Sequence, residues 1–308
     1  MPTLLYTHSA CLEHNPGDFH PESPARLEAV LGALQAPEFA ALERREAPKA
    51  AIDDLARVHP RRFVEALLAA IPQSGLAGID ADTIICPRSG EAALRAAGAV
   101  TAAVDAVMTG EAKSAFCAVR PPGHHAEPAR AMGFCLFNNV AVGAARARAL
   151  HGIARVAVID FDVHHGNGTQ AMFEREADLF YASTHQSPLY PGTGAASERG
   201  VGNIVNVPLR PMSGSAEFRR GVEQFILPAL DEFRPELLMI SAGFDAHRRD
   251  PLAQLNLVED DYSWVTERLL DCARRHAQGR AVSTLEGGYD LDALAASAAA
   301  HVRALMAG

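Results

Sequence analysis

Acidic and imidazole side chains alternate immediately after an apolar segment at residues 156–159. They are Asp160, Asp162 and His164, and two glycines follow shortly after them. In an extended backbone, residues two apart point to the same side, so these side chains can project together from the carboxyl end of a strand. Carboxylate oxygens and imidazole nitrogens are metal ligands, so this spacing indicates the outline of a metal site.

Three further polar segments each follow an apolar, strand-like run and carry groups that such a site would use. They are residues 120–125 with two adjacent histidines, residues 241–245 with Asp245, and residues 286–290 with Tyr289. Zinc binds histidine nitrogen and carboxylate oxygen, and a catalytic zinc keeps three protein ligands and one open position. Asp162, His164 and Asp245 would provide these three ligands.

On these residues the sequence resembles a known family, the zinc-dependent histone deacetylases and their bacterial relatives, the histone deacetylase-like amidohydrolases. The Arg-Pro-Pro-Gly-His-His run at 120–125 is typical of the class II-like branch. The other matches are spread over most of the chain, in the family's order: His20-Pro21-Glu22 with Pro24 and Arg26, and residues 133–135, 160–170, 191–194, 241–245 and 287–290. The resemblance implies the arginase/deacetylase fold, an α/β architecture on a mainly parallel sheet.

Composition sets bounds that do not depend on the motifs. The 308 residues are 48% apolar and 21% charged, which suffices for a substantial core, and no linker or repeat divides them. We therefore expect a single deacetylase-like catalytic domain over residues 1–308. The net charge of −9 argues against nucleic acid as a partner. No apolar stretch reaches the ~20 residues of a membrane span and the N-terminus lacks a signal core, so we expect no membrane association and a cytoplasmic location.

The five cysteines lie far apart in the sequence and contain no Cys-x-x-Cys pair. They are Cys11, Cys86, Cys117, Cys135 and Cys272. Neither a disulfide framework nor a thiolate zinc site is therefore indicated.

Strand-like and helix-like segments alternate along the chain and predict the sheet that would position the site. Apolar β-type runs occupy residues 3–7, 45–49, 115–119, 156–160, 179–183, 204–208, 237–241 and 281–286, which makes about eight strands. Alanine-rich or amphipathic segments at 91–108, 139–151, 217–233 and 260–276 favour helices. Strands connected through helices pair in parallel, and ligands of such sheets lie beyond the carboxyl ends of the strands.

The resemblance assigns proton transfer to His124 and His125, backed by Asp160 and Asn167 respectively. A carboxylate neighbour stabilises imidazolium and an amide does not, so we expect His124 to rest protonated and His125 to titrate closer to neutral pH. His125 is then the better general base, which takes a proton from the attacking water and returns it to the leaving amine.

The resemblance also implies roles for the remaining groups around the substrate. Tyr289 would donate its hydroxyl to the oxyanion that forms at the amide carbonyl. Phe134 and Tyr190 match the aromatic walls of the acyl-lysine channel, and Gly133 lets the backbone approach the substrate.

Other matches concern a second ion and the mouth of the channel. Asp160, Ser183 and Thr184, together with main-chain oxygens, match a structural potassium site. Glu22 and Arg26 belong to a loop that helps shape the mouth, although Glu22 could equally be a simple ion-pair partner of Arg26. Asp80 and Asp82 could belong to the rim, but solvated surface is the expected place for both.

These assignments predict an amidohydrolase with one zinc ion per chain, which removes acetyl or another small acyl group from an amine, most readily acyl-lysine, through metal-activated water. An acetylpolyamine amidohydrolase is the alternative, but Leu252 stands where some polyamine-selective members carry an acidic gatekeeper. An arginase-type enzyme with two manganese ions would need aspartates where Gly166 and His247 stand. A non-catalytic acyl-lysine-binding protein would be expected to lack a catalytic group, and none is missing. Whether the substrate is a peptide or a small molecule, and the number of subunits, a homo-oligomer included, are left open.

Overall fold

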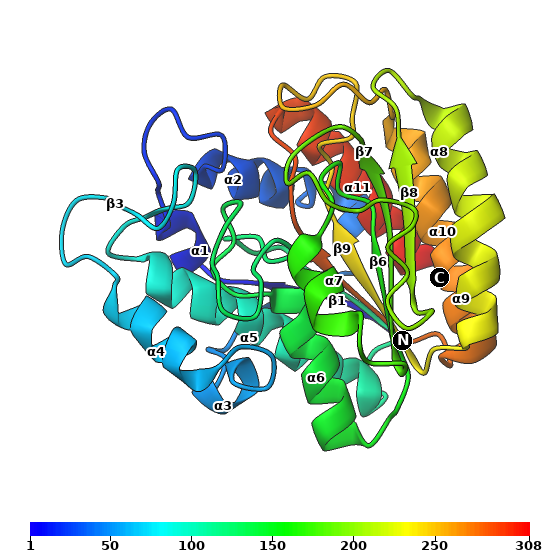
Figure 1. Ribbon diagram of the computed structural model, residues 1–308, viewed down its shortest axis with the longest axis horizontal. Helices are drawn as coiled ribbons and strands as arrows, with labels where there is room; N and C mark the ends of the chain where they lie inside the picture. Colours follow the sequence, from blue (N-terminus) through cyan, green and yellow to red (C-terminus); the bar gives the residue numbers. More distant parts are fainter.

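The computed structural model describes residues 1–308, and its centre is an eight-stranded sheet in which all neighbouring strands run parallel. The strand order is β2-β1-β5-β10-β9-β6-β7-β8, and helices flank the sheet (Figure 1). A small antiparallel hairpin, β3 (Ala77–Gly78) with β4 (Ile84–Ile85), forms a sheet of its own. The predicted α/β class, with about eight mainly parallel strands, is confirmed.

The strands of the main sheet are short, and the central ones are buried. Their bounds are β1 Thr3–Thr7, β2 Glu43–Glu46, β5 Ser114–Cys117, β6 Val156–Asp160, β7 Leu179–Gln186, β8 Ile204–Leu209, β9 Leu237–Ala242 and β10 Ala281–Leu285. Every residue of β6 and β9 is buried. A parallel strand covered by helices on both faces has no side for water, which explains why both sequences are nearly continuous apolar runs.

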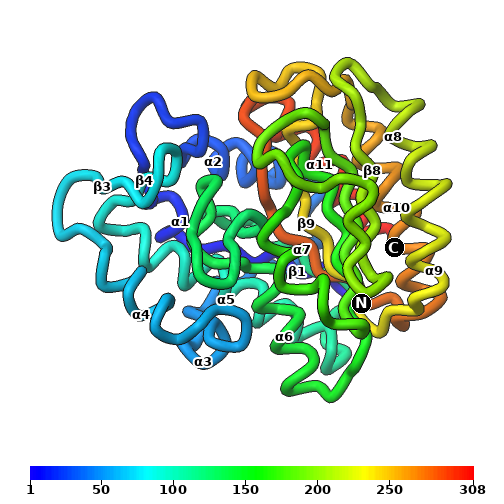
Figure 2. The backbone as a smooth tube through the Cα atoms, viewed as in Figure 1, coloured from blue at the N-terminus to red at the C-terminus, as the bar shows by residue number.

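Helices form a layer on each face of the sheet. One layer contains α5 (Ser89–Met108) and α6 (Asn139–His151); the other contains α2 (Pro24–Ala33), α10 (Glu259–His276) and α11 (Leu291–Ala307). Figure 2 shows the red helix α11 returning beside α2, near the start of the chain. The remaining segments are α1 Ala10–Glu13, a 3-10 turn Pro37–Phe39, α3 Ile52–Leu55, α4 Arg61–Ala69, α7 Asn167–Phe173, α8 Ser215–Gly221, a π-helical turn Val222–Ile226 and α9 Leu227–Phe233. None of the helices is both long enough and apolar enough to cross a lipid bilayer.

Most predicted elements lie within a few residues of the observed ones, and the exceptions have local causes. The strand predicted at 45–49 is wrong in its bounds: β2 pairs with β1 from Glu43 to Glu46, and Pro48 has no N–H to extend the ladder. The helix predicted at 217–233 is interrupted by the π-helical turn. Sequence analysis does not predict α2 or α11.

The central strands end at nearly the same level. Asp160, the last residue of β6, pairs with Ser183 of β7 on one side and with Ser241 of β9 on the other. Ser241 in turn pairs with Thr284 of β10. The loops that follow β6, β9 and β10 therefore begin side by side, and their polar side chains can meet at one edge of the sheet.

The packing of α5 generates a prediction about two helical glycines. A Cβ at Gly98 would lie 1.9 Å from the carbonyl oxygen of Pro48 and 2.7 Å from the nitrogen of Ala50, so backbone would have to move. Gly98→Ala should therefore lower the free energy of unfolding by about 1–3 kcal/mol, despite the better helix propensity of alanine. Gly32→Ala in α2, where nothing lies within 4 Å of the new Cβ, should raise it by up to about 1 kcal/mol. Urea unfolding measures the free energy of unfolding of both variants. Equal changes in the two variants would contradict this account of how α5 packs.

Candidate functional site

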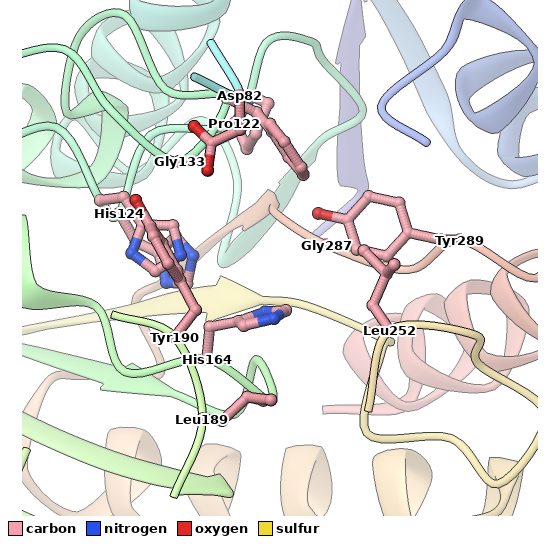
Figure 3. Close-up of a pocket in the computed structure, with 12 residues that line it drawn as sticks. Asp82, Pro122, His124, Gly133, His164, Leu189, Tyr190, Leu252, Gly287 and Tyr289 are labelled. Carbon is pink, nitrogen blue, oxygen red and sulfur yellow. The ribbon is translucent and has the colours of Figure 1, made fainter. Parts of the chain in front are cut away.

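A pocket of about 230 Å³ opens at the carboxyl edge of the sheet. Figure 3 shows Tyr190 and His124 facing Tyr289 across it, with His164 between them. The lining residues are Asp82, Pro122, His124, His125, Gly133, Phe134, His164, Leu189, Tyr190, Leu252, Gly287 and Tyr289. All but Asp82 belong to loops that follow strands of the main sheet. The fold therefore brings distant segments of the sequence to one place.

Asp162, His164 and Asp245 converge beside this pocket. Nδ1 of His164 lies 3.1 Å from Oδ1 of Asp162 and 3.1 Å from Oδ2 of Asp245. One nitrogen and two carboxylate oxygens thus lie within 4.8 Å of one another, and all three residues are buried. Nitrogen and carboxylate oxygen are zinc ligands, so the chemistry of the donor set fits the predicted metal.

The backbone reaches this arrangement through turns, so the predicted extended conformation from Asp160 to His164 is wrong. β6 ends at Asp160, whose Oδ1 accepts a hydrogen bond from the N–H of Asp162 over 3.1 Å. Oδ1 of Asp162 likewise accepts from the N–H of His164 over 2.9 Å. Aspartate often closes such turns with the residue two positions later. These turns, rather than the pleat of a strand, gather the side chains.

Two glycines leave room for the carboxylates. A Cβ at Gly243 would lie 2.1 Å from Oδ2 of Asp162, and one at Gly287 would lie 2.1 Å from Oδ2 of Asp245. The N–H of Gly287 donates to Oδ2 of Asp162 over 2.8 Å, and the N–H of Val163 donates to Oδ1 of Asp245 over 2.8 Å. Backbone donors therefore fix the direction of both carboxylates.

Positive charge is favoured between these carboxylates. Burial alone would lower the pKa of His164, but hydrogen bonds and charges from Asp162 and Asp245 outweigh burial and raise this pKa to about 10. The two carboxylates thus stabilise a cation at the point where they meet. A divalent metal would satisfy the same carboxylates and displace the imidazole proton, which is a second indication that the residues fit a metal.

His124 and His125 stand side by side, with their ring centroids 4.0 Å apart. Nδ1 of His124 lies 2.9 Å from Oδ2 of Asp160, whereas Nδ1 of His125 lies 2.8 Å from Oδ1 of Asn167. The two histidines therefore have the two different partners that the resemblance implies.

These partners give the two imidazoles different charges. Burial alone would lower the pKa of His124, but the charges of Asp162 and Asp160 hold this pKa well above its usual value. Burial, together with repulsion from His124 and His164, holds the pKa of His125 well below its usual value. His124 therefore rests protonated and His125 rests neutral near pH 7, so His125 is the one that can accept a proton.

Asn167 also determines which nitrogen of His125 is free. Its Nδ2 donates to Oε1 of Glu127 over 2.8 Å, so its Oδ1 faces His125 and can only accept a hydrogen bond. Nδ1 of neutral His125 must therefore carry the proton, and Nε2 keeps its lone pair. Because His125 lines the pocket, this lone pair is available to a molecule bound there.

Tyr289 is held firmly on the opposite side of the pocket (Figure 3). Burial holds the pKa of its phenol well above the usual value, so the hydroxyl keeps its proton and remains a donor. Its backbone N–H donates to Oδ2 of Asp250 over 2.7 Å, and the guanidinium of Arg26 lies 4.8 Å from the centroid of its ring. Both the backbone and the ring of Tyr289 are therefore positioned.

Gly133, Phe134, Tyr190 and Leu252 all line the pocket, as predicted for its walls. Gly133 has a φ of +56°, and a Cβ there would lie 2.6 Å from the ring of His125. The ring of Tyr190 stands edge-on to that of His125, with the centroids 5.1 Å apart, and Tyr190 is 37% exposed at the mouth. The walls are therefore mainly apolar and partly aromatic.

Glu286 is a buried positioning group that sequence reasoning misses. Its Oε2 accepts hydrogen bonds from the N–H groups of Gly123 over 2.7 Å and His124 over 3.2 Å, and its Oε1 accepts from Ser241 over 3.1 Å. Burial raises its pKa to about 7. This carboxyl ties the histidine loop to the loop of Tyr289. The only feature of the sequence that points to Glu286 is its position directly before the Gly-Gly-Tyr motif.

Glu22 takes part in more than the simple ion pair with Arg26. It is fully buried, lies 3.0 Å from Nη1 of Arg26, and accepts a hydrogen bond from Nη2 of Arg120 over 2.7 Å. Arg26 also donates from Nε to the carbonyl of Gly288 over 2.6 Å. The cluster therefore braces the loop that carries Tyr289.

Asp82 lines the pocket, so the rim is its place, and the expectation of general solvated surface is wrong for this residue. It lies between β3 and β4, and its N–H donates to Oδ1 of Asp80 over 3.2 Å. The hairpin, which sequence analysis does not predict, brings this carboxylate to the mouth.

The residues assigned to potassium lie at the ends of two neighbouring strands. Asp160 and Ser183 are paired in register, and Thr184 follows. The carboxylate of Asp160 already interacts with the N–H of Asp162, with His124 and with the hydroxyl of Tyr181. Because this carboxylate already has partners, the structure adds no support for potassium, which stays a prediction.

Comparisons with known proteins identify the family to which this chain belongs. A family model described as the histone deacetylase domain matches residues 20–305. The histone deacetylase-like amidohydrolase of Pseudomonas aeruginosa is 43% identical over 274 residues, which cover 87% of this chain and 71% of that protein. A probable deacetylase of Archaeoglobus fulgidus is 36% identical over 315 residues, which cover 100% of this chain and 87% of that protein.

A solved structure extends the likeness to the fold. The crystal structure of the HDA15 HD domain matches with a TM-score of 0.93 at 35% identity, over 99% of this chain and 88% of that one. Family model, relatives and fold thus agree over nearly the whole sequence, and the chain belongs to the histone deacetylase family of amide hydrolases.

Proposed function

We propose that this protein is a zinc-dependent deacetylase, formed as one catalytic domain by residues 1–308, which removes acetyl or another small acyl group from acyl-lysine. The observation that carries the proposal is the convergence of Asp162, His164 and Asp245 beside the pocket that His125 and Tyr289 line. This arrangement combines a metal site, a general base and a donor for an oxyanion, which are the groups that amide hydrolysis needs.

Each polar group of the pocket has a task in this reaction. Zinc, when bound by the ligand trio, would polarise the amide carbonyl and make water more acidic. Nε2 of His125 takes a proton from the attacking water and later gives a proton to the leaving amine. Tyr289 donates its hydroxyl to the carbonyl oxygen as negative charge develops there. His124, which the charges of Asp162 and Asp160 keep protonated, helps to hold the pKa of His125 low.

The pocket walls favour an acyl group at the end of a slender apolar stem. Phe134, Tyr190 and Leu252 surround a cavity of about 230 Å³, and Asp82 is the one acidic residue among those lining it. Leu252 offers no charge to a second ammonium group. Acyl-lysine therefore fits better than an acetylated polyamine, whose hydrolysis stays the alternative.

A two-metal ureohydrolase is not supported by the surroundings of the ligand trio. A Cβ at Gly166 would lie 2.4 Å from Oδ2 of Asp160, so no longer side chain fits there. The other position that would need an aspartate is occupied by His247, and the Nε2 atom of this histidine lies 3.5 Å from Oε1 of Glu259. A non-catalytic reader is also disfavoured, because His125, Tyr289 and the ligand trio, to which the proposal gives the catalytic roles, are all present at or beside the pocket.

A substrate panel tests the proposed reaction. Zinc-reconstituted protein should hydrolyse acetyl-lysine peptides with a kcat/KM about tenfold or more above that for acetylated diamines, because Leu252 offers no negative charge to the free ammonium group of the diamine. Leu252→Glu should shift this ratio toward diamines, whereas Leu252→Met, the matched control, should leave it unchanged. Zinc-loaded protein that is inert toward every acyl amide would overturn the proposed function, and a preference of the unmodified protein for diamines would establish the alternative.

Loss of one metal ligand should abolish zinc binding at the pocket and turnover together. Asp245→Ala removes one of the two carboxylates that stabilise a cation at His164, so the zinc content should fall by one ion per chain and activity should disappear. Asp292→Ala, at an exposed aspartate of α11, should change neither quantity. Elemental analysis and kinetics provide the two measurements. Full zinc content in Asp245→Ala would exclude this ligand set.

Substitution of the two histidines should separate the base from its charged neighbour. His125→Ala should keep zinc and lower kcat about 10²–10⁴-fold. His124→Ala removes a positive charge that lowers the pKa of His125, so in this variant the acid limb of kcat/KM should move to higher pH. Kinetics across pH, with metal analysis, measure both effects. If His125→Ala stays active and His124→Ala does not, the base is assigned to the wrong histidine.

A further inference from the structure

A second group of side chains of metal-ligand type lies between α9 and α10, and none of its members lines the pocket. Figure 1 shows α9 and α10 side by side at the edge of the molecule, and the two helices are in contact. Cys272 and His276 are four residues apart on α10, so they lie on the same face of that helix, one turn apart. Asp231 of α9 faces them.

The three side chains already approach one another. Nε2 of His276 lies 2.9 Å from Oδ1 of Asp231, and one nitrogen, one sulfur and one carboxylate oxygen lie within 4.8 Å of each other. Cys272 is 1% exposed, whereas the side chains of His276 and Asp231 are 20% and 43% exposed. The sulfur thus forms the buried end of the group, and the opposite end is open to water. Sulfur, nitrogen and oxygen donors with one open position are typical ligands of zinc and similar metals.

The surrounding charges permit a cation here. His276 is the last residue of α10, where the carbonyl groups give the helix end a partial negative charge. One cation competes, because Nη2 of Arg275 lies 2.6 Å from Oδ1 of Asp231. The side chain of Arg275 is 49% exposed, so it can move into solvent at small cost.

We infer that Asp231, Cys272 and His276 form a second site for a divalent transition metal of the zinc class, which links α9 to α10. Upon binding, the thiol of Cys272 releases its proton to solvent and a sulfur–metal bond replaces the S–H bond, without change of oxidation state. Burial, then the charge of Asp231, raises the pKa of Cys272 to about 12, so binding should release a proton and tighten as the pH rises. Unlike the ligand trio of the pocket, this site contains sulfur.

The sulfur ligand allows the site to be observed separately with cobalt(II). Full-length protein loaded with Co²⁺ should show a thiolate-to-cobalt charge-transfer band in the near ultraviolet, because the pocket ligands contain no sulfur. Cys272→Ser should abolish this band and lower the bound cobalt by one ion per chain. Cys86→Ser, at the cysteine that lies near His14, is the matched control and should retain the band.

Two further measurements keep the test decisive. His276→Gln, at a partly exposed position, should weaken cobalt binding at this site about tenfold or more while circular dichroism shows an unchanged fold. Added Co²⁺ should raise the Tm of the unmodified protein more than that of His276→Gln. A cobalt-loaded protein without the band, or a band that persists in Cys272→Ser, would overturn the inference. These readouts do not depend on turnover, so they stand or fall separately from the proposed deacetylase activity.

Discussion

Buried negative charge is the constraint on which the rest of the structure depends. Asp160, Asp162, Asp245 and Glu286 are each at most 1% exposed, and all contribute to one edge of the sheet. A buried carboxylate without partners costs several kcal/mol, so the fold must supply donors and positive charge at this edge. Backbone N–H groups supply many of the donors, and protonated imidazoles supply positive charge. The pocket therefore lies where hydrogen-bond donors and positive charges surround the buried carboxylates.

The parallel sheet makes this concentration of charge feasible. Its central strands end at one level, so N–H groups at the start of the loops after β6 and β10 can point at neighbouring carboxylates, as those of Val163 and Gly287 do. Glycines at these points allow the close approach that a side chain would prevent. The same geometry separates the roles of His124 and His125, because one faces a carboxylate and the other faces an amide that Glu127 holds in place.

Some of this arrangement can be predicted from the sequence. The remainder depends on contacts that leave no recognisable pattern among neighbouring residues of the sequence. The strands around the site and residues such as Asp162 and Tyr289 are predictable, because short motifs directly follow apolar runs. The turn after Asp160 is not, because a hydrogen bond from backbone to side chain leaves no periodic signal. The role of Glu286 depends on Gly123, which is 163 positions away. Asp82 reaches the mouth through a hairpin too short to give a strand pattern.

The π-helical turn at Val222–Ile226 has a geometric consequence for the whole outer helix. The buried residues Phe218, Val222, Ile226 and Leu230 are spaced by four, whereas an α-helix completes a turn every 3.6 residues. In a uniform α-helix, this spacing would carry Leu230 about 120° around the axis relative to Phe218. The wider turn unwinds that drift and keeps all four on one side. One local change of pitch thus sets how α9 is rotated about the helix axis. This rotation in turn determines the direction in which Asp231, next to Leu230, points.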